Sequence, residues 1–396
     1  MKVNIIARPD HSLKMYSGVL KCKKTEDEVN LYTFYALKEG GFLSKLFPRL
    51  KTAPRTSIVL NAYTFITRIS NKFLRKIGMN HRENEVRMFE LLAPRVSIEN
   101  CDVLHYWPFY CAKMVERIKQ DNKGICTVAE YYEAEPSYAN NIYDQEYIRF
   151  GLKSEDHGNL KIDQNQCFKF ENNIIVPSEF TKETYQSKFP NKTYFVCSYG
   201  SAGYELCDNY EEIIDFNVEV KSKRIVFVGQ VCVEKGVHYL IEAVKNLDVT
   251  LDLIGPIRKG QEELFSSLIG GSDNVKYIGA KKNHDVLLLL KEYQIFCMPS
   301  LSDSYSLASV EALSRGLPVI VTESCGIKDN IKQYQLGYVA QVQSAASIKE
   351  CIGQFYGSFD YSQFKIGLRE FFSEEYSQKY PQSVYQVYKT IVKNKK

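Results

Sequence analysis

The amino-acid sequence predicts an α/β protein made of two doubly wound domains, each a parallel sheet covered by helices. Two observations lead to this prediction. At 396 residues the chain exceeds the length that one hydrophobic core usually supports, so two domains are expected. Short apolar runs also alternate with helical stretches, which is typical of parallel sheets whose ligand crevice lies at the carboxyl ends of the strands.

The expected strands are short apolar runs bounded by polar or turn residues. In the first half they lie at residues 1–7, 101–107, 124–132, 172–178 and 193–200. In the second half they lie at residues 224–229, 249–255, 295–300 and 319–321. Ser178 is expected to cap a helix, because Thr181 and Glu183 follow it in a first turn.

Residues 205–219 (ELCDNYEEIIDFNVE) separate the two halves. This stretch is acidic and weakly patterned, and Gly200 and Gly203 lie just before it. We interpret it as the link between domains. The first domain is then expected at residues 1–204 and the second at residues 205–374.

The stretch from Cys297 to Ile320 is expected to carry the chemistry of the chain. A strand ends at Ser300, small polar residues form a turn, a helix begins at Leu307 and ends at Gly316, and a new strand follows. Unpaired N–H groups and the positive end of the helix dipole would face the crevice. Such an arrangement favours an anion such as a phosphate.

Two acidic residues, Asp303 and Glu311, lie in this stretch. If the helix began as early as Asp303, both carboxylates would share one helix face and could address one ligand. Alternatively, Asp303 is only an N-cap and Glu311 a solvated helix residue. These two residues alone leave both interpretations open.

The surrounding pattern, PS-x(2)-D-x(3)-L-x(2)-VEAL-x(2)-G-LPVI, resembles the signature of family 4 glycosyltransferases, which are retaining sugar transferases of the GT-B fold. The resemblance implies two Rossmann-like domains that face each other across a cleft, with residues 375–396 crossing back onto the first domain. It implies that Glu311 holds the ribose of a nucleotide-sugar and that Asp303 lies near the transferred sugar. Asp303 is one methylene shorter than the usual Glu. Ser304, Tyr305 and Ser306 stand where the family favours glycines.

A second segment, KRIVFVGQVCVEKGVHYLIEAV, resembles the family's strand, Gly-Arg, Glu-Lys-Gly, helix motif. Lys235 matches the lysine that clamps the donor diphosphate, and the backbone at Ser306 and Leu307 is expected to assist it. Gln230, directly after Gly229, stands where the family has Arg. The site therefore lacks one positive charge that normally stabilises the departing diphosphate.

Further matches to the family are spread over the chain. Residues 275–280, with Ile278, match the strand whose backbone and following loop hold the base, and residues 336–341 match a closing strand. Gly18 lies in the loop that touches the phosphates or the sugar in family members. Glu130 ends a strand near which many members have a His that meets the sugar. It could bind a sugar hydroxyl or act as a base, or be a surface residue.

Residues 44–87 are strongly basic. Ten Lys or Arg residues stand against two Glu, although the whole chain carries only +4, and Phe and Leu residues are interleaved with the charges. This pattern between residues 45 and 87 favours an anionic membrane surface over nucleic acid, because apolar side chains would be idle in a contact with phosphates alone. A solvated basic face over ordinary core contacts is the alternative.

The sequence therefore predicts an enzyme that moves a sugar from a nucleotide-sugar to a saccharide or lipid-linked acceptor, in bacterial surface polysaccharide synthesis. Scattered cysteines and the lack of an 18-residue apolar run predict a cytoplasmic protein, peripheral on the inner face of the membrane. No metal or cofactor is expected. The alternatives are an impaired partner subunit of another transferase and a nucleotide-sugar epimerase. A dehydrogenase is less favoured, because no GxGxxG follows a strand.

Overall fold

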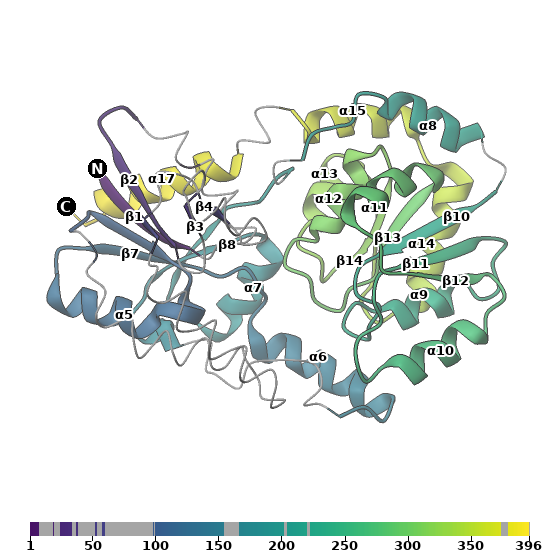
Figure 1. The fold of residues 1–396 in the computed structure, drawn as a ribbon, viewed down its shortest axis with the longest axis horizontal. Coiled ribbons are helices and arrows are strands. Elements are labelled where there is room, and N and C mark those ends of the chain that lie inside the picture. Colours follow the sequence, from purple (N-terminus) through teal and green to yellow (C-terminus); the bar gives the residue numbers. More distant parts are fainter. Residues whose placement is uncertain are drawn as a thin grey trace.

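The computed structural model shows two parallel sheets side by side, each flanked by helices (Figure 1). It describes residues 1–7, 24–33, 100–153, 166–201, 204–219, 222–373 and 379–395, with short pieces at 19, 37–38, 52–53, 58–59 and 98. The predicted α/β fold of two doubly wound domains is confirmed. Most of the basic segment 44–87, and Gly18, lie outside the described residues.

The N-terminal sheet has seven strands in the order β5-β2-β1-β6-β7-β8-β9, all paired in parallel. The strands are β1 (Lys2–Ala7), β2 (Glu28–Thr33), β5 (Ile58–Val59), β6 (Val103–Tyr106), β7 (Cys126–Glu130), β8 (Asn173–Val176) and β9 (Thr193–Val196). The segments between them include helices α5 (Pro108–Asp121), α6 (Pro136–Arg149) and α7 (Glu179–Lys188), and the short helix η3 (Gln166–Lys169). Strands β3 (Leu37–Lys38) and β4 (Thr52–Ala53) form a separate pair.

The C-terminal sheet has six parallel strands in the order β12-β11-β10-β13-β14-β15. The strands are β10 (Arg224–Val228), β11 (Thr250–Ile254), β12 (Val275–Gly279), β13 (Ile295–Met298), β14 (Val319–Thr322) and β15 (Gly337–Ala340). Helices α9 (Val237–Val244), α10 (Glu262–Gly270), α11 (Asn283–Leu289), α12 (Leu307–Ser314), α13 (Lys328–Gln333), α14 (Ala345–Ser358) and α15 (Tyr361–Phe371), with the short η4 (Leu290–Glu292), complete this unit. Except for the half-buried Val228, the apolar side chains of β10, β11 and β13 are buried because both sheet faces are covered.

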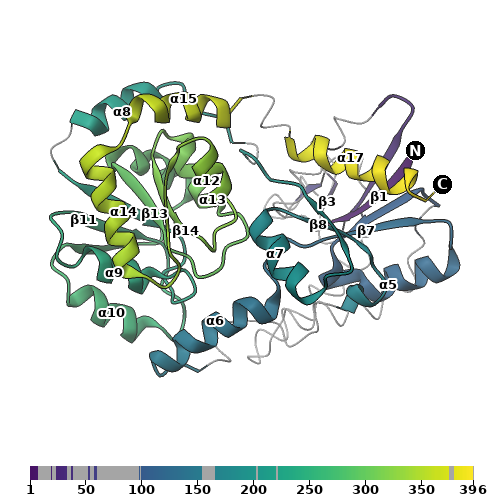
Figure 2. The same ribbon diagram turned by 180° about the vertical axis from the view of Figure 1, so that it is seen from behind.

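Helix α17 (Lys379–Lys393) lies against the N-terminal sheet although it follows the C-terminal unit in sequence (Figure 2). Its Tyr388 hydroxyl lies 2.7 Å from His105 Nδ1, and its Tyr380 hydroxyl donates hydrogen bonds to Glu130. Buried tyrosines thus join α17 to β6 and β7. The exact domain boundaries at residues 204/205 and 374/375 stay predictions.

Most of the stretch interpreted as the link between domains is helical, because residues Tyr210–Glu219 form helix α8. Tyr210 and Ile214, one turn apart, are buried, and Arg369 Nε of α15 donates a hydrogen bond of 2.6 Å to the Tyr210 hydroxyl. Figure 1 shows α8 and α15 side by side. Acidic residues surround the short buried stripe of this helix. The stripe is therefore weak in the sequence, and the helical spacing was not recognised.

Among the described residues, no helix combines the length and the apolar composition needed to cross a bilayer.

Candidate functional site

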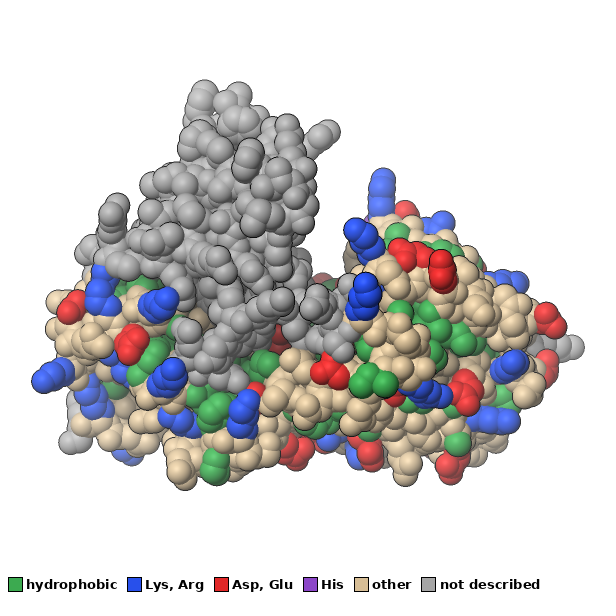
Figure 3. Space-filling model, turned by 90° about the horizontal axis from the view of Figure 1, so that it is seen from below, with side chains coloured by type: hydrophobic (Ala, Val, Ile, Leu, Met, Phe, Trp, Pro, Cys, Tyr) green, Lys and Arg blue, Asp and Glu red, His purple; other side chains and the backbone are tan. Residues whose placement is uncertain are grey.

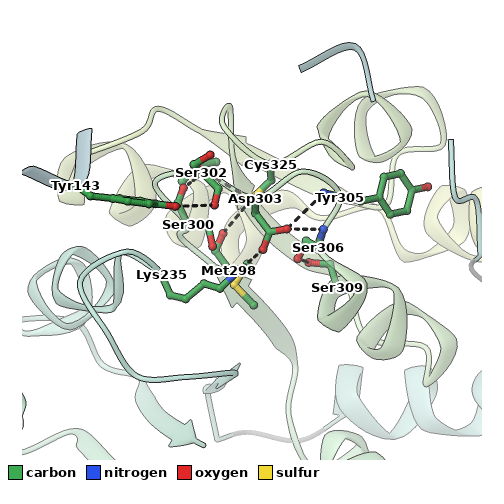
Figure 4. Close-up of polar contacts among 11 residues, drawn as sticks. Tyr143, Lys235, Met298, Ser300, Ser302, Asp303, Tyr305, Ser306, Ser309 and Cys325 are labelled. Carbon is green, nitrogen blue, oxygen red and sulfur yellow. Dashed lines mark hydrogen bonds and ion pairs between the residues drawn. The ribbon is translucent and has the colours of Figure 1, made fainter. Parts of the chain in front are cut away.

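Asp303 is the centre of the turn that follows β13. Its Oδ1 accepts hydrogen bonds from the backbone N–H of Ser306 (2.7 Å) and of Tyr305 (3.3 Å). Its Oδ2 accepts a hydrogen bond of 2.6 Å from Lys235 Nζ (Figure 4). Asp303 therefore caps the turn and also pairs with the cation predicted for the donor diphosphate.

Helix α12 begins at Leu307, as predicted, and not at Asp303. Ser306, just before it, has a φ of 67°, a left-handed conformation that glycine adopts without strain. The family's preference for glycine in this turn thus has a structural reason. The condition under which Asp303 and Glu311 would share one helix face is not met, because Asp303 lies outside the helix.

Lys235 reaches Asp303 because Gly236 lets two segments approach closely. Gly236 has a φ of 64°, and a Cβ at this position would lie 1.9 Å from the carbonyl oxygen of Pro299. The chain that enters α9 is therefore pressed against the end of β13. Burial lowers the pKa of Lys235, but the Asp303 carboxylate outweighs this and raises the pKa above its usual value, so Lys235 is a cation.

The N-terminal domain also holds this turn in place. Ser178, the N-cap of α7 as predicted, accepts a hydrogen bond from the N–H of Thr181, and its hydroxyl donates one of 2.8 Å to the Ser304 carbonyl oxygen. A Cβ at Gly326 would lie 1.8 Å from that same carbonyl oxygen. The turn before α12 is therefore clamped between the two domains.

The side chain of Tyr305 points away from the Asp303 carboxylate (Figure 4). Its hydroxyl donates a hydrogen bond of 2.9 Å to the carbonyl oxygen of Gly200 and lies near Asn330. Only the backbone of Tyr305 thus faces the position expected for a donor. Leu307 is half-buried at the helix start, and the Ser306 hydroxyl lies 2.7 Å from that of Ser309.

Glu311 lies inside α12 and faces two polar groups from other elements. The Tyr204 hydroxyl donates a hydrogen bond of 2.5 Å to Glu311 Oε1, and Asn283 Nδ2 donates one of 3.1 Å to the same oxygen. A carboxylate with these two neighbours can accept hydrogen bonds from a diol such as ribose. Sequence reasoning missed Tyr204 and assigned no such role to Asn283, because both are far from Glu311 along the chain.

Gly229 and Gln230 follow β10 at the carboxyl edge of the sheet. Gln230 Oε1 accepts hydrogen bonds from Arg258 Nε (3.2 Å) and Nη2 (3.0 Å). Arg258 also pairs through Nη1 with the buried carboxylate of Glu234. Glu234 Oε1 in turn accepts a hydrogen bond of 2.8 Å from Tyr147 of α6. Sequence reasoning missed Arg258 and Tyr147; a basic residue just after the glycine exit of β11 was the only signal for Arg258.

Two other predicted residues lie apart from this turn. Ile278 is in the edge strand β12, where its side chain is exposed. Glu130 was expected at the mouth of a crevice, and the structure corrects this: its side chain is 1% exposed, Tyr380 donates to both carboxylate oxygens, and His105 Nε2 lies 3.0 Å from Oε2. A catalytic role for Glu130 stays a prediction, and this buried position does not favour it.

Figure 3 shows Lys and Arg side chains along the edge of the C-terminal domain that faces the N-terminal half. Among the residues that the structure describes, no group of three or more His, Cys, Asp or Glu is placed to hold a metal ion. The groups that contact the Asp303 carboxylate are the Lys235 cation and the N–H donors of Tyr305 and Ser306.

Comparison with known proteins found one family. Residues 209–358 match the family described as "Glycosyl transferases group 1". An uncharacterised glycosyltransferase of Methanocaldococcus jannaschii is 25% identical over 252 residues, which is 60% of this chain and 61% of that protein. An uncharacterised protein from the cps region of Klebsiella pneumoniae is 25% identical over 174 residues, or 44% of this chain and 48% of that protein. The match thus spans about half to three fifths of these relatives.

Among solved structures, HepE of Anabaena in complex with UDP and glucose superimposes with a TM-score of 0.55. It covers 100% of both chains at 12% sequence identity. At this identity the likeness concerns the fold alone.

Proposed function

Residues 209–358 match the glycosyl transferases group 1 family and the chain has the GT-B fold, and on this premise we propose that it is a retaining glycosyltransferase of that family. It would move a sugar from a nucleotide-sugar to a saccharide or lipid-linked saccharide acceptor. The observation that carries the proposal is the contact of Lys235 with Asp303 at the start of α12. It puts a fixed cation beside a helix N-terminus, at the carboxyl edge of a parallel sheet.

The donor would lie in the C-terminal domain. Lys235 and the backbone at Ser306 and Leu307 would hold its diphosphate, because a cation and N–H donors favour an anion. Glu311, between Tyr204 and Asn283, would accept hydrogen bonds from the ribose hydroxyls. The solved structure of HepE of Anabaena contains UDP, so a UDP-sugar is the first donor to test.

In the proposed reaction the bond between the anomeric carbon and the diphosphate oxygen breaks, and the acceptor oxygen bonds to that carbon on the same face. The acceptor proton passes to the departing diphosphate, which leaves as a nucleoside diphosphate. Lys235 lowers the barrier by stabilising the negative charge that develops on the leaving group. Asp303, which fixes the position of Lys235, would lie near the transferred sugar.

The acceptor would bind the N-terminal domain, and the process would be synthesis of a bacterial surface polysaccharide. The relative from the cps region of Klebsiella pneumoniae supports this assignment. The basic segment at residues 45–87 would bring the protein to an anionic membrane surface that carries lipid-linked acceptors.

A panel of UDP-, GDP-, ADP- and dTDP-sugars tests the proposal. The purified protein is incubated with each sugar, and its melting temperature and the slow hydrolysis of the donor are measured. One donor that raises the melting temperature and is hydrolysed is the expected result. Donor converted to an isomer without hydrolysis or transfer would identify an epimerase.

Two observations favour a second function, that of an impaired partner subunit of another transferase. Gln230 carries no charge, and both oxygens of Asp303 accept hydrogen bonds from the protein itself. Such a subunit would keep the fold without turnover. If no sugar of the panel raises the melting temperature and none is hydrolysed, the result would favour the impaired partner subunit over the transferase.

A further inference from the structure

Gln230 marks the place where the family motif has a positive charge and this chain has none. It follows Gly229 at the end of β10, and its side chain is exposed at the carboxyl edge of the C-terminal sheet. An amide side chain donates and accepts hydrogen bonds but cannot neutralise a diphosphate. A working site would need its second cation from another part of the chain.

Arg258, from the loop after β11, brings a guanidinium to this place. Its Nε and Nη2 donate hydrogen bonds of 3.2 and 3.0 Å to Gln230 Oε1. The backbone fixes the approach, since the N–H of Arg258 donates to the Val231 carbonyl oxygen (3.0 Å) and the N–H of Val231 donates to that of Pro256 (2.9 Å). The contact of Gln230 and Arg258 is thus built on two paired segments.

The charges around Arg258 keep it a cation and tie it to the same motif as Lys235. Burial lowers the pKa of Arg258, but the Glu234 carboxylate together with Cys232 and Tyr147 outweighs this and raises the pKa above its usual value. Glu234 is the residue directly before Lys235, so one short segment contacts Arg258 and also carries the lysine that pairs with Asp303. The Arg258 side chain remains 23% exposed, which leaves a ligand access to it.

We propose that Arg258 is a donor-binding residue that contacts the diphosphate of the nucleotide-sugar and supplies the charge that position 230 lacks. Gln230 is a positioning residue, because its amide oxygen orients the guanidinium plane. A planar guanidinium donates two parallel N–H groups to phosphate oxygens, which a lysine cannot do. This inference rests on the proposed function and adds to it the source of the second cation.

The test measures the affinity for the nucleoside diphosphate of the donor base by calorimetric titration, in wild-type protein and four variants. Arg258→Gln is expected to weaken binding roughly tenfold or more, since it removes charge-assisted hydrogen bonds. Lys259→Gln removes an equal charge from the neighbouring exposed residue and is expected to change binding less than about twofold. Lys235→Gln is the positive control.

The fourth variant moves the charge. In Gln230→Arg/Arg258→Gln the guanidinium starts from the position that the family motif uses. Affinity is expected to return to within about threefold of wild type, because the same charge again faces the diphosphate. Arg258→Gln and the double variant both lack Arg258, so a structural effect of its loss is present in both. Recovery of affinity in the double variant would therefore show that the charge acts in donor binding.

Two results would overturn the inference while the proposed function stands. In one, Lys235→Gln weakens binding but Arg258→Gln behaves like Lys259→Gln. In the other, Arg258→Gln weakens binding and lowers the melting temperature, and the double variant Gln230→Arg/Arg258→Gln restores neither the affinity nor the melting temperature. If wild-type protein binds none of UDP, GDP, ADP and dTDP, the proposed function itself fails, and the inference fails with it.

Discussion

Two pairs of titratable side chains lie near the carboxyl ends of strands, one in each domain, and they differ in what surrounds them. In the N-terminal domain His105 and Glu130 are 0% and 1% exposed, 3.0 Å apart, and covered by Tyr380 and Tyr388 of α17. In the C-terminal domain Lys235 and Asp303 are 33% and 14% exposed and 2.6 Å apart. The first pair is sealed by the chain itself, whereas a ligand can reach the second.

The difference shows how similar residues serve stability in one place and binding in another. Glu130 accepts hydrogen bonds from Tyr380 of α17 and lies 3.0 Å from His105 of β6, and thereby fastens a distant helix to the sheet. One carboxylate oxygen of Asp303 accepts hydrogen bonds from N–H groups before α12, and the other accepts one from the partly exposed Lys235. Removing a partner should therefore unfold the first site and inactivate the second.

The largest expected effect is that of Lys235→Ala. We expect turnover of the donor to fall roughly 10²- to 10³-fold, because the charge that stabilises the departing diphosphate is lost. The melting temperature should change little, since Lys235 is partly exposed and its ion pair contributes only modestly to stability. Steady-state kinetics and thermal melting measure the two effects.

Lys259→Ala is the matched control, because it removes a lysine that is exposed in the loop after β11. Turnover by Lys235→Ala equal to that of this control would remove Lys235 from the site. A large fall in melting temperature would instead make the Lys235 pair structural, like that of Glu130.

Glu130→Gln should have the opposite signature. Breaking a buried pair leaves His105 and Tyr380 with an altered partner, so we expect the free energy of unfolding to fall by about 3 kcal/mol. Turnover per folded molecule should be unchanged. Urea denaturation followed by activity at matched folded fractions checks both.

Glu179→Gln provides the comparison, since Glu179 forms an exposed pair with Lys182 at 3.0 Å in the same domain. Its cost should stay below about 1 kcal/mol. If Glu130→Gln lost activity while keeping wild-type stability, Glu130 would be the catalytic residue that the sequence first indicated.

The C-terminal domain could be read from sequence to a large extent, because its signals are local. Its strands, to within two residues at each end, and the start of α12 at Leu307 each follow from a few neighbouring residues. The Ser178 cap in the N-terminal domain was predicted in the same way. The match over residues 209–358 confirms the family resemblance drawn from the same segments. Local patterns of this kind are fixed by turn chemistry and apolar periodicity.

The parts that sequence reasoning missed depend on contacts between distant residues. Arg258 reaches Gln230 from 28 residues away, and Ser178 reaches Ser304 from 126 residues away. The direction of the Tyr305 ring depends on Gly200 in the segment after β9. Helix α6 was also unrecognised as an interdomain element. Its Tyr138, Tyr143 and Tyr147 contact the other domain, and the helix has no strong apolar stripe of its own.

Glu146 of α6 forms a third pair, which joins the domains and should have the smallest and most pH-dependent effect. Its Oε2 lies 3.2 Å from His238 Nε2, and its Oε1 accepts hydrogen bonds from Tyr239 and Gln343. Burial raises the pKa of Glu146, but these contacts outweigh it and lower the pKa from 4.5 to about 2. The carboxylate is therefore favoured in the folded protein.

Because the folded-state pKa is lowered, the stabilisation by Glu146 is fully present above about pH 4.5 and is lost as the pH falls towards 2. Glu146→Gln should cost about 1–2 kcal/mol at pH 7, since glutamine keeps one acceptor oxygen. The difference in melting temperature between wild type and variant should shrink between pH 4.5 and 2.5. Glu263→Gln, an exposed change on α10, should show no such trend. A difference that stays constant over this range would mean that Glu146 holds the domains by packing and not by its charge.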